Sequence, residues 1–300
     1  MPVANGSREK GRVAKRPVGE SSFAAPGNGD GAKVAETRFD RGVPIRAISR
    51  GLAVIQAVNR IGPISMMEIS RAAEVPYPTA CRIVQTLIHQ GMIEREPSRK
   101  RYRATALVQT LSTGYQAEDA LVGVARDHLV KLTELVNWPI SLATRVGTSM
   151  MVRDSTHGQT SLTFTNYYAG YTLPISECAS GKAYIAHCDQ AELDAIVEGW
   201  RMTESDTSRV GLVMVGDNAL LEDIRSRGFA VHNRNTYTAD SGKTSSIAVP
   251  IFRGAGGEVV GTLTLIYFAS SMTNVEVAQR YLTDLQETSA NIGRELAALA

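Results

Sequence analysis

One short stretch of the sequence combines side chains that can contact a DNA base edge with others that can hold a phosphate. At about 100° per residue, one side of a helix over residues 78–89 would carry this set: Pro78, Thr79, Arg82, Gln85, Thr86 and His89. Arginine can bond a guanine edge at two points, glutamine can pair with adenine, and threonine can touch a phosphate or a thymine methyl group. Cations follow at Arg95, Arg99, Lys100, Arg101 and Arg103. They would neutralise phosphates or enter the minor groove, which predicts salt-dependent affinity rather than sequence choice.

The opposite side of this helix is apolar and would pack on two preceding helices. Its residues are Ala80, Ile83, Val84, Leu87 and Ile88. The first preceding helix is predicted from Ile48 to the Arg-Ile-Gly-Pro stretch, with an apolar repeat at Ile48, Leu52, Ile55 and Val58. The second begins with a Ser65–Glu68 capping box, in which each side chain satisfies a free backbone amide. Its buried side would be Met66, Ile69, Ala72 and Ala73.

The third helix is followed by a predicted basic hairpin. Pro78 suits the first helical position because its missing N–H costs nothing there, and Gly91 ends the helix. "MIERE" and "RYRAT" then predict two strands around the turn "PSRK". Three helices and a basic hairpin over residues 44–105 have the order of a winged helix-turn-helix, whose third helix enters the major groove. The alternatives are a solvated amphipathic helix with an exposed basic turn, or a winged helix that contacts protein.

The charge distribution favours a polyanion as the partner of this region. The 300-residue chain has a net charge of +2, yet residues 42–110 hold ten Lys and Arg against four Asp and Glu. Residues 111–300 hold fourteen against twenty-one. A basic module joined to an acidic body fits a nucleic-acid-binding domain attached to a second domain. Residues 1–43 lack apolar periodicity and predict a disordered tail, whose basic residues could contact DNA non-specifically.

The rest of the chain predicts a linker helix and a mixed domain. Residues 106–137 predict a long helix, which Gly114 could interrupt, with an apolar side at Leu107, Leu111, Leu121, Val124, Leu129, Leu132 and Val136. Strand patterns follow in "ISLATRV", "SMMVRDS", "SLTFTNYY", "SSIAVPIF" and "VVGTLTLIYF". Helical patterns appear in "SGKAYIAHC", "AELDAIVEGW" and the last 25 or so residues. Without a regular βαβ repeat, residues 138–300 predict an α/β domain on a largely antiparallel sheet.

The composition disfavours membrane and secreted classes. No apolar run approaches the roughly 18–20 residues of a membrane span, and the N-terminus lacks the apolar core and cleavage site of a secretory signal. The cysteines, Cys81, Cys178 and Cys188, are odd in number and widely spaced, which argues against a disulfide framework. A reducing cytoplasm is the expected location.

The stretch from "SRGLAVIQAVNRIGP" to "EREPSRKRYRAT" resembles the DNA-binding domain of the IclR family of bacterial transcriptional regulators. The likeness continues through "LPISECASGKAYIA", "RSRGFAVHN" and "SSIAVPIFRGAGGEVVGTLTL", in the order that family shows, and covers about residues 46–298. It implies an N-terminal winged helix, a linker helix making the dimer contact, and a GAF-like C-terminal domain that binds a small effector. Family members act as dimers or tetramers on palindromic operators, as repressors or activators. The implied partners are double-stranded DNA, a small-molecule effector, further copies of the chain and RNA polymerase, with no cofactor.

Three stretches, "WPISLAT", "VRDSTHG" and "ASGKAYIAHC", are most similar to one branch of that family. It is the branch that responds to hydroxyphenylpropionate and related aromatic acids (MhpR-type regulators). This likeness implies an aromatic carboxylic acid as the effector and an aromatic-degradation operon as the target. The alternative is a repressor of another catabolic pathway with a non-aromatic organic acid as effector.

The sequence departs from the family pattern in three places. Where the family has Ser or Thr capping the recognition helix, this sequence has Pro78 preceded by Tyr77, so the cap bond is lost while Tyr77 could itself reach DNA. The segment Asn233–Thr236 stands where the family has an acidic pair, and Ser246 stands where a cysteine is common. Because the last two changes lie near the family's effector pocket, the ligand need not be a short oxo-acid.

"SECASGKAYIA" predicts a loop that enters a helix at Ala179–Gly181. Small residues there let a ligand approach the backbone, and free amides with the helix dipole favour a carboxylate. Carried over from the family, the pocket residues are Leu173, Ala179, Ser180, Gly181, Thr236, Thr244, Ser246 and Thr264, with Leu162 and Phe164 as an apolar wall. The alternative is that Ala179 and Gly181 serve close helix–sheet packing and the threonines are ordinary strand formers.

The sequence offers little support for the alternative that the protein is an enzyme or holds a metal ion. There is no Gly-x-Ser-x-Gly and no His-Glu-x-x-His, and the glycines of "RGAGGEVVG" precede a strand, as in a hairpin turn. His187 and Cys188 are helix neighbours that point about 100° apart and seldom share a ligand. Asp154 and His157 could form an acid–base pair, but the sequence shows no third catalytic partner for them. A polar loop is therefore the expected structure there. The remaining rival is an interaction module whose acidic C-terminal domain binds a protein.

Overall fold

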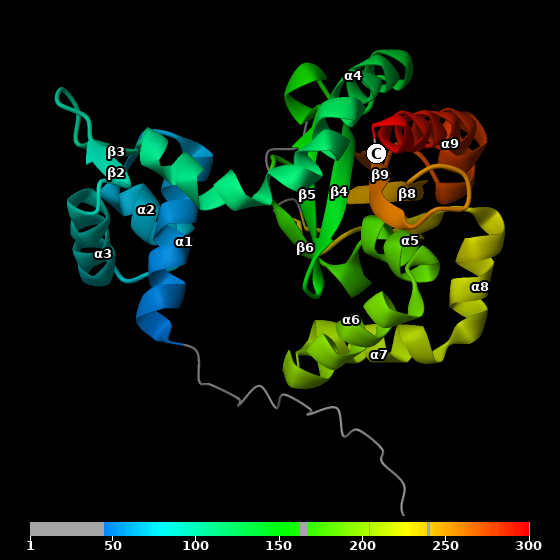
Figure 1. Ribbon diagram of the computed structural model, residues 1–300, viewed down its shortest axis with the longest axis horizontal. Helices are drawn as coiled ribbons and strands as arrows, with labels where there is room; N and C mark the ends of the chain where they lie inside the picture. The colour runs from blue at the N-terminus through cyan, green and yellow to red at the C-terminus, as the bar shows by residue number, and fades with distance from the viewer. Residues whose placement is uncertain (1–44, 163–166, 204, 239–240, 300) are drawn as a thin grey trace, which may run out of the picture. The chain divides into compact units, whose positions relative to one another are not determined.

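The computed structural model describes residues 45–162, 167–203, 205–238 and 241–299, with the backbone alone for residues 113–119 (Figure 1). The predicted tail over residues 1–43 therefore lies outside the described residues. The N-terminal body comprises α1 (Arg46–Ile61), β1 (Ile64–Ser65), α2 (Met66–Ala72), α3 (Tyr77–His89), β2 (Ile93–Arg95) and β3 (Arg101–Ala104). The chain continues through the 3₁₀ segment η1 (Ala106–Glu118) into the C-terminal body.

The predicted buried side of α1 was wrong in its first half. Ile48 and Leu52 are 58% and 54% exposed, whereas the buried residues of the helix all lie between Val54 and Val58. The reason is the size of the body: the core formed with α2, α3 and β2 includes only Val54 and Val58 from this helix. The first turns of α1 therefore have no partner within the N-terminal body to pack against.

The start of α2 agrees with the predicted capping box. The Glu68 carboxylate accepts a hydrogen bond from the Ser65 amide at 2.7 Å, and the Ser65 hydroxyl accepts one from the Glu68 amide at 3.4 Å. These bonds lower the pKa of Glu68. The next helix, α3, begins one residue earlier than predicted, at Tyr77, and Pro76 caps it without a side-chain bond. Gly91, with a φ of +73°, turns the chain out of α3 in the left-handed conformation that glycine adopts most readily.

The hairpin forms an antiparallel wing with one strand more than predicted. β2 and β3 pair so that Glu94 lies opposite Arg103 and Arg95 opposite Tyr102. The two-residue strand β1 pairs with the other edge of β3 and makes it the central strand. A two-residue strand carries too little alternation to be seen in the sequence.

The predicted linker helix is divided, although not at Gly114. A 3₁₀ segment ends at Glu118, and the α-helix α4 (Asp119–Val136) begins at the next residue. The predicted apolar side is confirmed only within α4, where Leu121, Leu129, Leu132 and Val136 are buried. Leu107 and Leu111 are exposed, because η1 does not carry them against this core.

The C-terminal body is a six-stranded antiparallel sheet in the order β6-β5-β4-β9-β8-β7. Its strands are β4 (Ile140–Val146), β5 (Ser149–Ser155), β6 (Thr172–Pro174), β7 (Ala230–His232), β8 (Thr244–Phe252) and β9 (Val259–Phe268). Its further helices are η2 (His157–Gln159), η3 (Ile175–Glu177), α5 (Ala179–His187), α6 (Gln190–Thr203), α7 (Asp206–Gly216), α8 (Asn218–Arg227) and α9 (Asn274–Ala298). The largely antiparallel α/β domain is thus confirmed.

Alternating side chains of the long strands divide the core between the two faces of the sheet. On β8, Ile247, Val249 and Ile251 pack with α4 and α9, whereas Ala248 packs with the cluster that includes α5 to α8. Figure 1 shows α4 and α9 on one side of the sheet and α5 on the other. Continuous apolar runs such as "SSIAVPIF" are therefore buried on both faces.

The strand predicted for "SLTFTNYY" is not found at its described residues. Ser161, Leu162, Tyr167 and Tyr168 are outside any strand, and the edge of the sheet is instead β6. The helices α7 and α8 were not predicted. Among the described residues, no helix has the length and apolar character needed to cross a membrane.

Candidate functional site

The outward side of α3 presents polar groups that the N-terminal body leaves unused. The side chains of Arg82, Gln85 and His89 are exposed and make no hydrogen bond or ion pair with the described residues. The Thr86 hydroxyl donates to the Arg82 carbonyl at 3.0 Å, so it is satisfied within the helix. Tyr77, just before Pro78, is also exposed. The side chains at the centre of the predicted set are therefore available to an external partner.

Two other residues of α3 depart from the predicted division. Thr79 is half-buried, and Ile88, which was predicted to pack inward, is exposed. Ala80 and Val84 are fully buried and fix the helix on the core. The fully buried part of α3 is consequently narrower than predicted, with Ile83 and Leu87 only partly buried against the same core.

The five cations of the wing are all exposed, but the body itself holds two of them. Arg103 pairs with Glu94 across the hairpin, with Nε 2.6 Å from Oε1. Arg101 donates from Nη1 to the Pro63 carbonyl at 2.9 Å. Arg95, Arg99 and Lys100 have no partner among the residues that the structure describes. These three cations contribute most of the positive charge that a phosphate would meet.

A small cavity in the C-terminal body collects five of the predicted effector residues. They are Leu173, Ala179, Ser180, Ser246 and Thr264. They come from β6, the first turn of α5, β8 and β9, which antiparallel pairing and helix packing bring together. The cavity measures about 20 Å³, which is room for about one water molecule.

The other predicted effector residues are not at this cavity. Thr236 is exposed, and Thr244 is buried with its hydroxyl 3.5 Å from that of Thr238. Leu162 lines a different cavity, beside α4, together with Asn137. Gly181 is packed against the backbone of Ile175 in η3, where a Cβ would meet the carbonyl oxygen at 1.8 Å. Phe164 lies outside the described residues.

The first turn of α5 is capped by a buried thiol. Cys178 Sγ accepts hydrogen bonds from the Gly181 amide at 3.3 Å and from the Ser180 hydroxyl at 3.2 Å. Burial raises the pKa of Cys178, so the thiol is neutral at physiological pH. Thr264, only 6% exposed, has a buried hydroxyl oxygen without a hydrogen-bond partner in the described part of the chain. This cavity therefore combines a helix N-terminus with an unused hydroxyl group.

Asn235 is a cavity residue that the sequence analysis missed. Its side-chain nitrogen donates to the Glu177 carbonyl at 3.0 Å, and its oxygen accepts from the Tyr237 amide at 2.8 Å. It thereby ties the segment after β7 to the entrance of α5. Asn235 lies in the segment Asn233–Thr236, which stands where the family has an acidic pair. Its position in that segment was the one signal in the sequence that could have identified it as a pocket residue.

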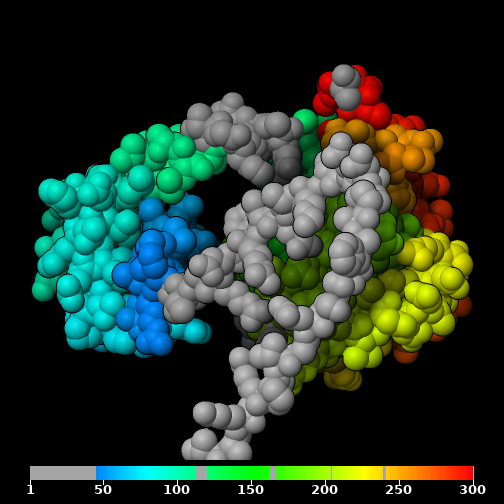
Figure 2. Space-filling view, turned by 60° about the horizontal axis from the view of Figure 1, so that its bottom comes forward, coloured from blue at the N-terminus to red at the C-terminus, as the bar shows by residue number. Residues whose placement is uncertain are grey.

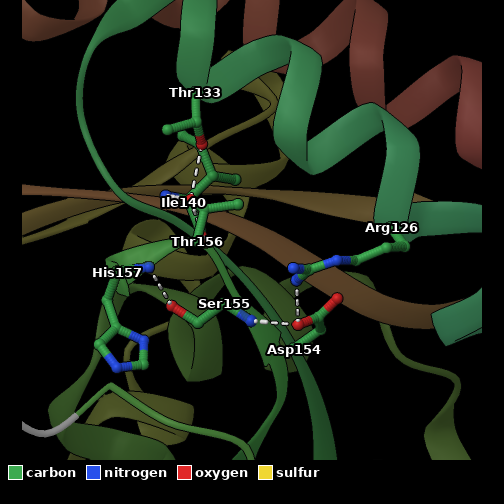
Figure 3. A network of polar contacts seen from close by, with 7 residues as sticks. All are labelled: Arg126, Thr133, Ile140, Asp154, Ser155, Thr156 and His157. Carbon is green, nitrogen blue, oxygen red and sulfur yellow. Dashed lines mark hydrogen bonds and ion pairs between the residues drawn. The ribbon is translucent and has the colours of Figure 1, made fainter. Parts of the chain in front are cut away.

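A partly buried set of polar contacts connects β5 and Thr156, the residue after it, with α4 (Figure 3). Arg126 donates to Asp154 at 2.7 Å, and the Thr133 and Thr156 hydroxyl oxygens are 2.6 Å apart. Figure 3 shows the His157 ring turned away from Asp154, so these two residues do not form an acid–base pair. Because β5 also supplies Met150 and Val152 to the small cavity, one strand links that cavity to α4.

Two family models match the chain. Residues 47–97 match the IclR helix-turn-helix domain, and residues 114–294 match the bacterial transcriptional regulator IclR C-terminal domain. The HTH-type transcriptional regulator XynR of Escherichia coli (strain K12) is 21% identical over 254 residues, which is 84% of this chain and 97% of that regulator. TsaQ1/TsaQ2 of Comamonas testosteroni, another HTH-type transcriptional regulator, is 20% identical over 163 residues, or 54% of this chain and 59% of that protein.

Solved structures show the same fold. The Thermotoga maritima IclR structure aligns with a TM-score of 0.57 at 22% identity, covering 85% of this chain and 100% of that one. An IclR homolog from Microbacterium hydrocarbonoxydans, complexed with 4-hydroxybenzoate, aligns with a TM-score of 0.58 at 18% identity, covering 84% and 99%. At these identities the likeness establishes the architecture, and the ligand remains a property of that homolog.

Proposed function

The chain belongs to the IclR family of bacterial transcriptional regulators, and from that premise we propose how it binds DNA and how a ligand controls it. It is a DNA-binding regulator rather than an enzyme. We propose that α3 lies in the major groove of a palindromic site and that the wing holds the flanking phosphates. The observation that carries this proposal is the exposed polar row of α3, whose arginine, glutamine and histidine have no partner among the described residues.

Base contacts and phosphate contacts fall to different residues in this proposal. Arg82 and Gln85 can each make two parallel hydrogen bonds to a base edge. Arg95, Arg99 and Lys100 would contact phosphates without regard to sequence. A variant of the first group should therefore change specificity, and a variant of the second should change salt dependence.

The substitution Arg82→Ala tests the base contact. It should weaken binding to the native promoter fragment by about 1–3 kcal/mol, roughly 5- to 150-fold, and leave binding to unrelated duplex nearly unchanged. Fluorescence anisotropy with both duplexes at fixed salt measures the difference. Arg280→Ala, which removes an exposed arginine from α9, is the matched control. An equal loss on both duplexes would make Arg82 a phosphate contact instead.

We further propose that the cavity at the start of α5 is the effector site and that it takes an aromatic carboxylic acid. The amide-rich first turn of a helix favours a carboxylate. The unused hydroxyl of Thr264 and the neighbouring Ser246 offer hydrogen bonds, and Met150, Leu173 and Tyr167 offer an apolar wall. The complex of the Microbacterium homolog with 4-hydroxybenzoate supports this class of ligand.

Binding would require the cavity to open. An aromatic ring cannot enter 20 Å³, so its walls must move when a ligand binds. The strand β5 carries two of these walls and, through Asp154, is bonded to Arg126 of α4. Ligand binding would thus favour one arrangement of β5 and α4, which changes the spacing of two DNA-binding domains in a dimer. Control of an aromatic catabolic operon would be the biological outcome.

The isosteric substitution Thr264→Val tests the effector site. It should weaken 4-hydroxybenzoate binding about tenfold, because it removes a hydrogen-bonding group, while DNA binding without ligand stays unchanged. Isothermal titration of the full chain measures the affinity. Thr262→Val, on the same strand but outside the cavity, should bind ligand as the parent does. If 4-hydroxybenzoate, hydroxyphenylpropionate and cinnamate all fail to bind the parent, the C-terminal body is better interpreted as a protein-binding module.

A further inference from the structure

A second and much larger cavity lies away from the effector cavity, and the two share no lining residue. It measures about 490 Å³, opens to the surface, and is bordered by α9, β8, the turn after β8 and the adjoining ends of α5 and α8. Pro250 and Phe252 lie on its β8 side, and Ala290 lies on its α9 side. Figure 2 shows α8, in yellow, and α9, in red, both reaching the surface of this body.

The charged residues of this second cavity are all basic. Arg225 and Arg294 line it, and no Asp or Glu is among its described lining residues. Neither arginine has a carboxylate within ion-pairing distance in the described part of the chain. Arg225 hydrogen-bonds the Ala186 carbonyl, and Arg294 hydrogen-bonds the Asn291 side chain. Both guanidinium groups are thus held by neutral partners, and no carboxylate among the described residues offsets their charge.

A histidine at the same cavity is affected by this charge. Burial lowers the pKa of His187, and the positive charge of Arg225 lowers it further, while a bond to the Ala183 carbonyl at 2.8 Å opposes the shift. His187 is therefore neutral near pH 7, and its ring packs edge-on against Phe252 at 5.5 Å. Near pH 7 the lining then carries two exposed guanidinium groups as its charges, beside apolar side chains and the neutral polar residues His187, Gln286 and Ser289.

We propose that this cavity is a second ligand site and that it takes an apolar carboxylic acid. Its volume lies within the range of roughly 300–1,000 Å³ typical of small-molecule sites. Phe252 and Pro250 would contact the apolar part of the ligand. Arg294 would receive the carboxylate, because a guanidinium group matches a carboxylate with two parallel hydrogen bonds. Arg225 stands at the same cavity and adds attraction for the negative charge.

The two cavities are connected through shared elements. The helix α5 contributes Ala179 and Ser180 to the effector cavity and His187, at its other end, to the second cavity. The strand β8 likewise contributes Ser246 to one and Phe252 to the other. A ligand in the second cavity therefore contacts the same helix and strand that hold the effector site.

The test is a titration of the full chain with octanoate and with 1-octanol, which has the same chain and no charge. We expect octanoate to bind at least about tenfold more tightly. Arg294→Gln should remove that advantage and leave the octanol affinity unchanged, whereas Arg280→Gln, which removes an exposed arginine elsewhere on α9, should have no effect. Ala290→Trp should abolish binding of both, because the indole fills the cavity.

Other outcomes would overturn the proposal. Equal affinity for octanoate and octanol would show that Arg225 and Arg294 do not bind the carboxylate. Tighter binding of octyl phosphate than of octanoate would show that the site prefers a phosphate group to a carboxylate. Loss of octanoate binding in Thr264→Val, but not in Ala290→Trp, would place the acid in the effector cavity. DNA binding and 4-hydroxybenzoate binding are measured on the same variants, so failure of the second site is distinguishable from failure of the proposed function.

Discussion

Replacing Gly181 with alanine is expected to destabilise the C-terminal body by about 3 kcal/mol or more, at the upper end of over-packing effects. A Cβ at this position would lie 1.8 Å from the Ile175 carbonyl oxygen and 2.6 Å from its carbon. Both are backbone atoms, which cannot rotate away as a side chain can. Relief requires α5 and η3 to separate, and this separation would also displace Ala179 and Ser180 from the proposed effector cavity.

Urea denaturation of the full chain, monitored by fluorescence of Trp138 and Trp200, measures this loss. The matched control is Gly123→Ala on α4, where an added Cβ meets nothing within 4 Å. That control should stabilise by about 0.5–1 kcal/mol, because alanine is the better helix former. A Gly181→Ala variant as stable as the parent would contradict the close approach of α5 to η3.

Replacing Thr156 with valine is the second change for which we expect a large effect, a loss of about 2–4 kcal/mol. Thr156 is completely buried, and its hydroxyl oxygen accepts the Ile140 amide at 2.9 Å and lies 2.6 Å from the Thr133 hydroxyl oxygen (Figure 3). Valine has the same shape and neither donates nor accepts. Two buried polar groups, the Ile140 amide and the Thr133 hydroxyl, would then lose this hydrogen-bond partner. Each unsatisfied buried group costs about 1–3 kcal/mol.

A double-mutant cycle with Thr133→Val isolates this network. Thr133→Val alone should cost less, because Thr156 keeps its bonds to both backbone groups of Ile140. The double variant should be more stable than the sum of the two single losses predicts, because the hydroxyl pair is removed together. Strictly additive losses in thermal denaturation would show that the two hydroxyl groups do not interact.

Local patterns predicted much of the fold. The Ser65–Glu68 capping box depends on residues three positions apart, and strands β4 and β5 coincide with the residues predicted for them. The helices α7 and α8 were missed, although Ser205 and Asp217 cap them through side-chain oxygens. Attention to N-cap residues would have found them, because capping is as local as the capping box.

Features that depend on distant partners could not be predicted in the same way. Ile48 and Leu52 follow the helical repeat, yet whether they are buried depends on how far the rest of the body extends along α1. The alternation of "SLTFTNYY" suits a strand, but a strand also requires a neighbour with free hydrogen-bonding groups. The residues within either segment give no information about whether such a packing or pairing partner is present.

The two candidate sites differ in the same way: one depends on a local pattern, and the other depends on residues that are distant in the sequence. Position on one helix predicted that Arg82, Gln85 and His89 would be exposed together. The proposed effector cavity joins residues from several elements. Family resemblance therefore selected Ser246 and Thr264, which line it, but also Thr236, which is exposed elsewhere. A loop residue such as Thr236 is carried to its final position by the path of the chain, which a motif does not specify.

The short edges of the six-stranded sheet have a consequence for assembly. The outermost strands, β6 and β7, contain three residues each, and each already pairs with its inner neighbour. So short an edge offers very few free amides and carbonyls on which another polypeptide could align. Copies of this regulator should therefore meet through side chains on helices and loops, and self-association should leave the strand content measured by infrared spectroscopy unaltered.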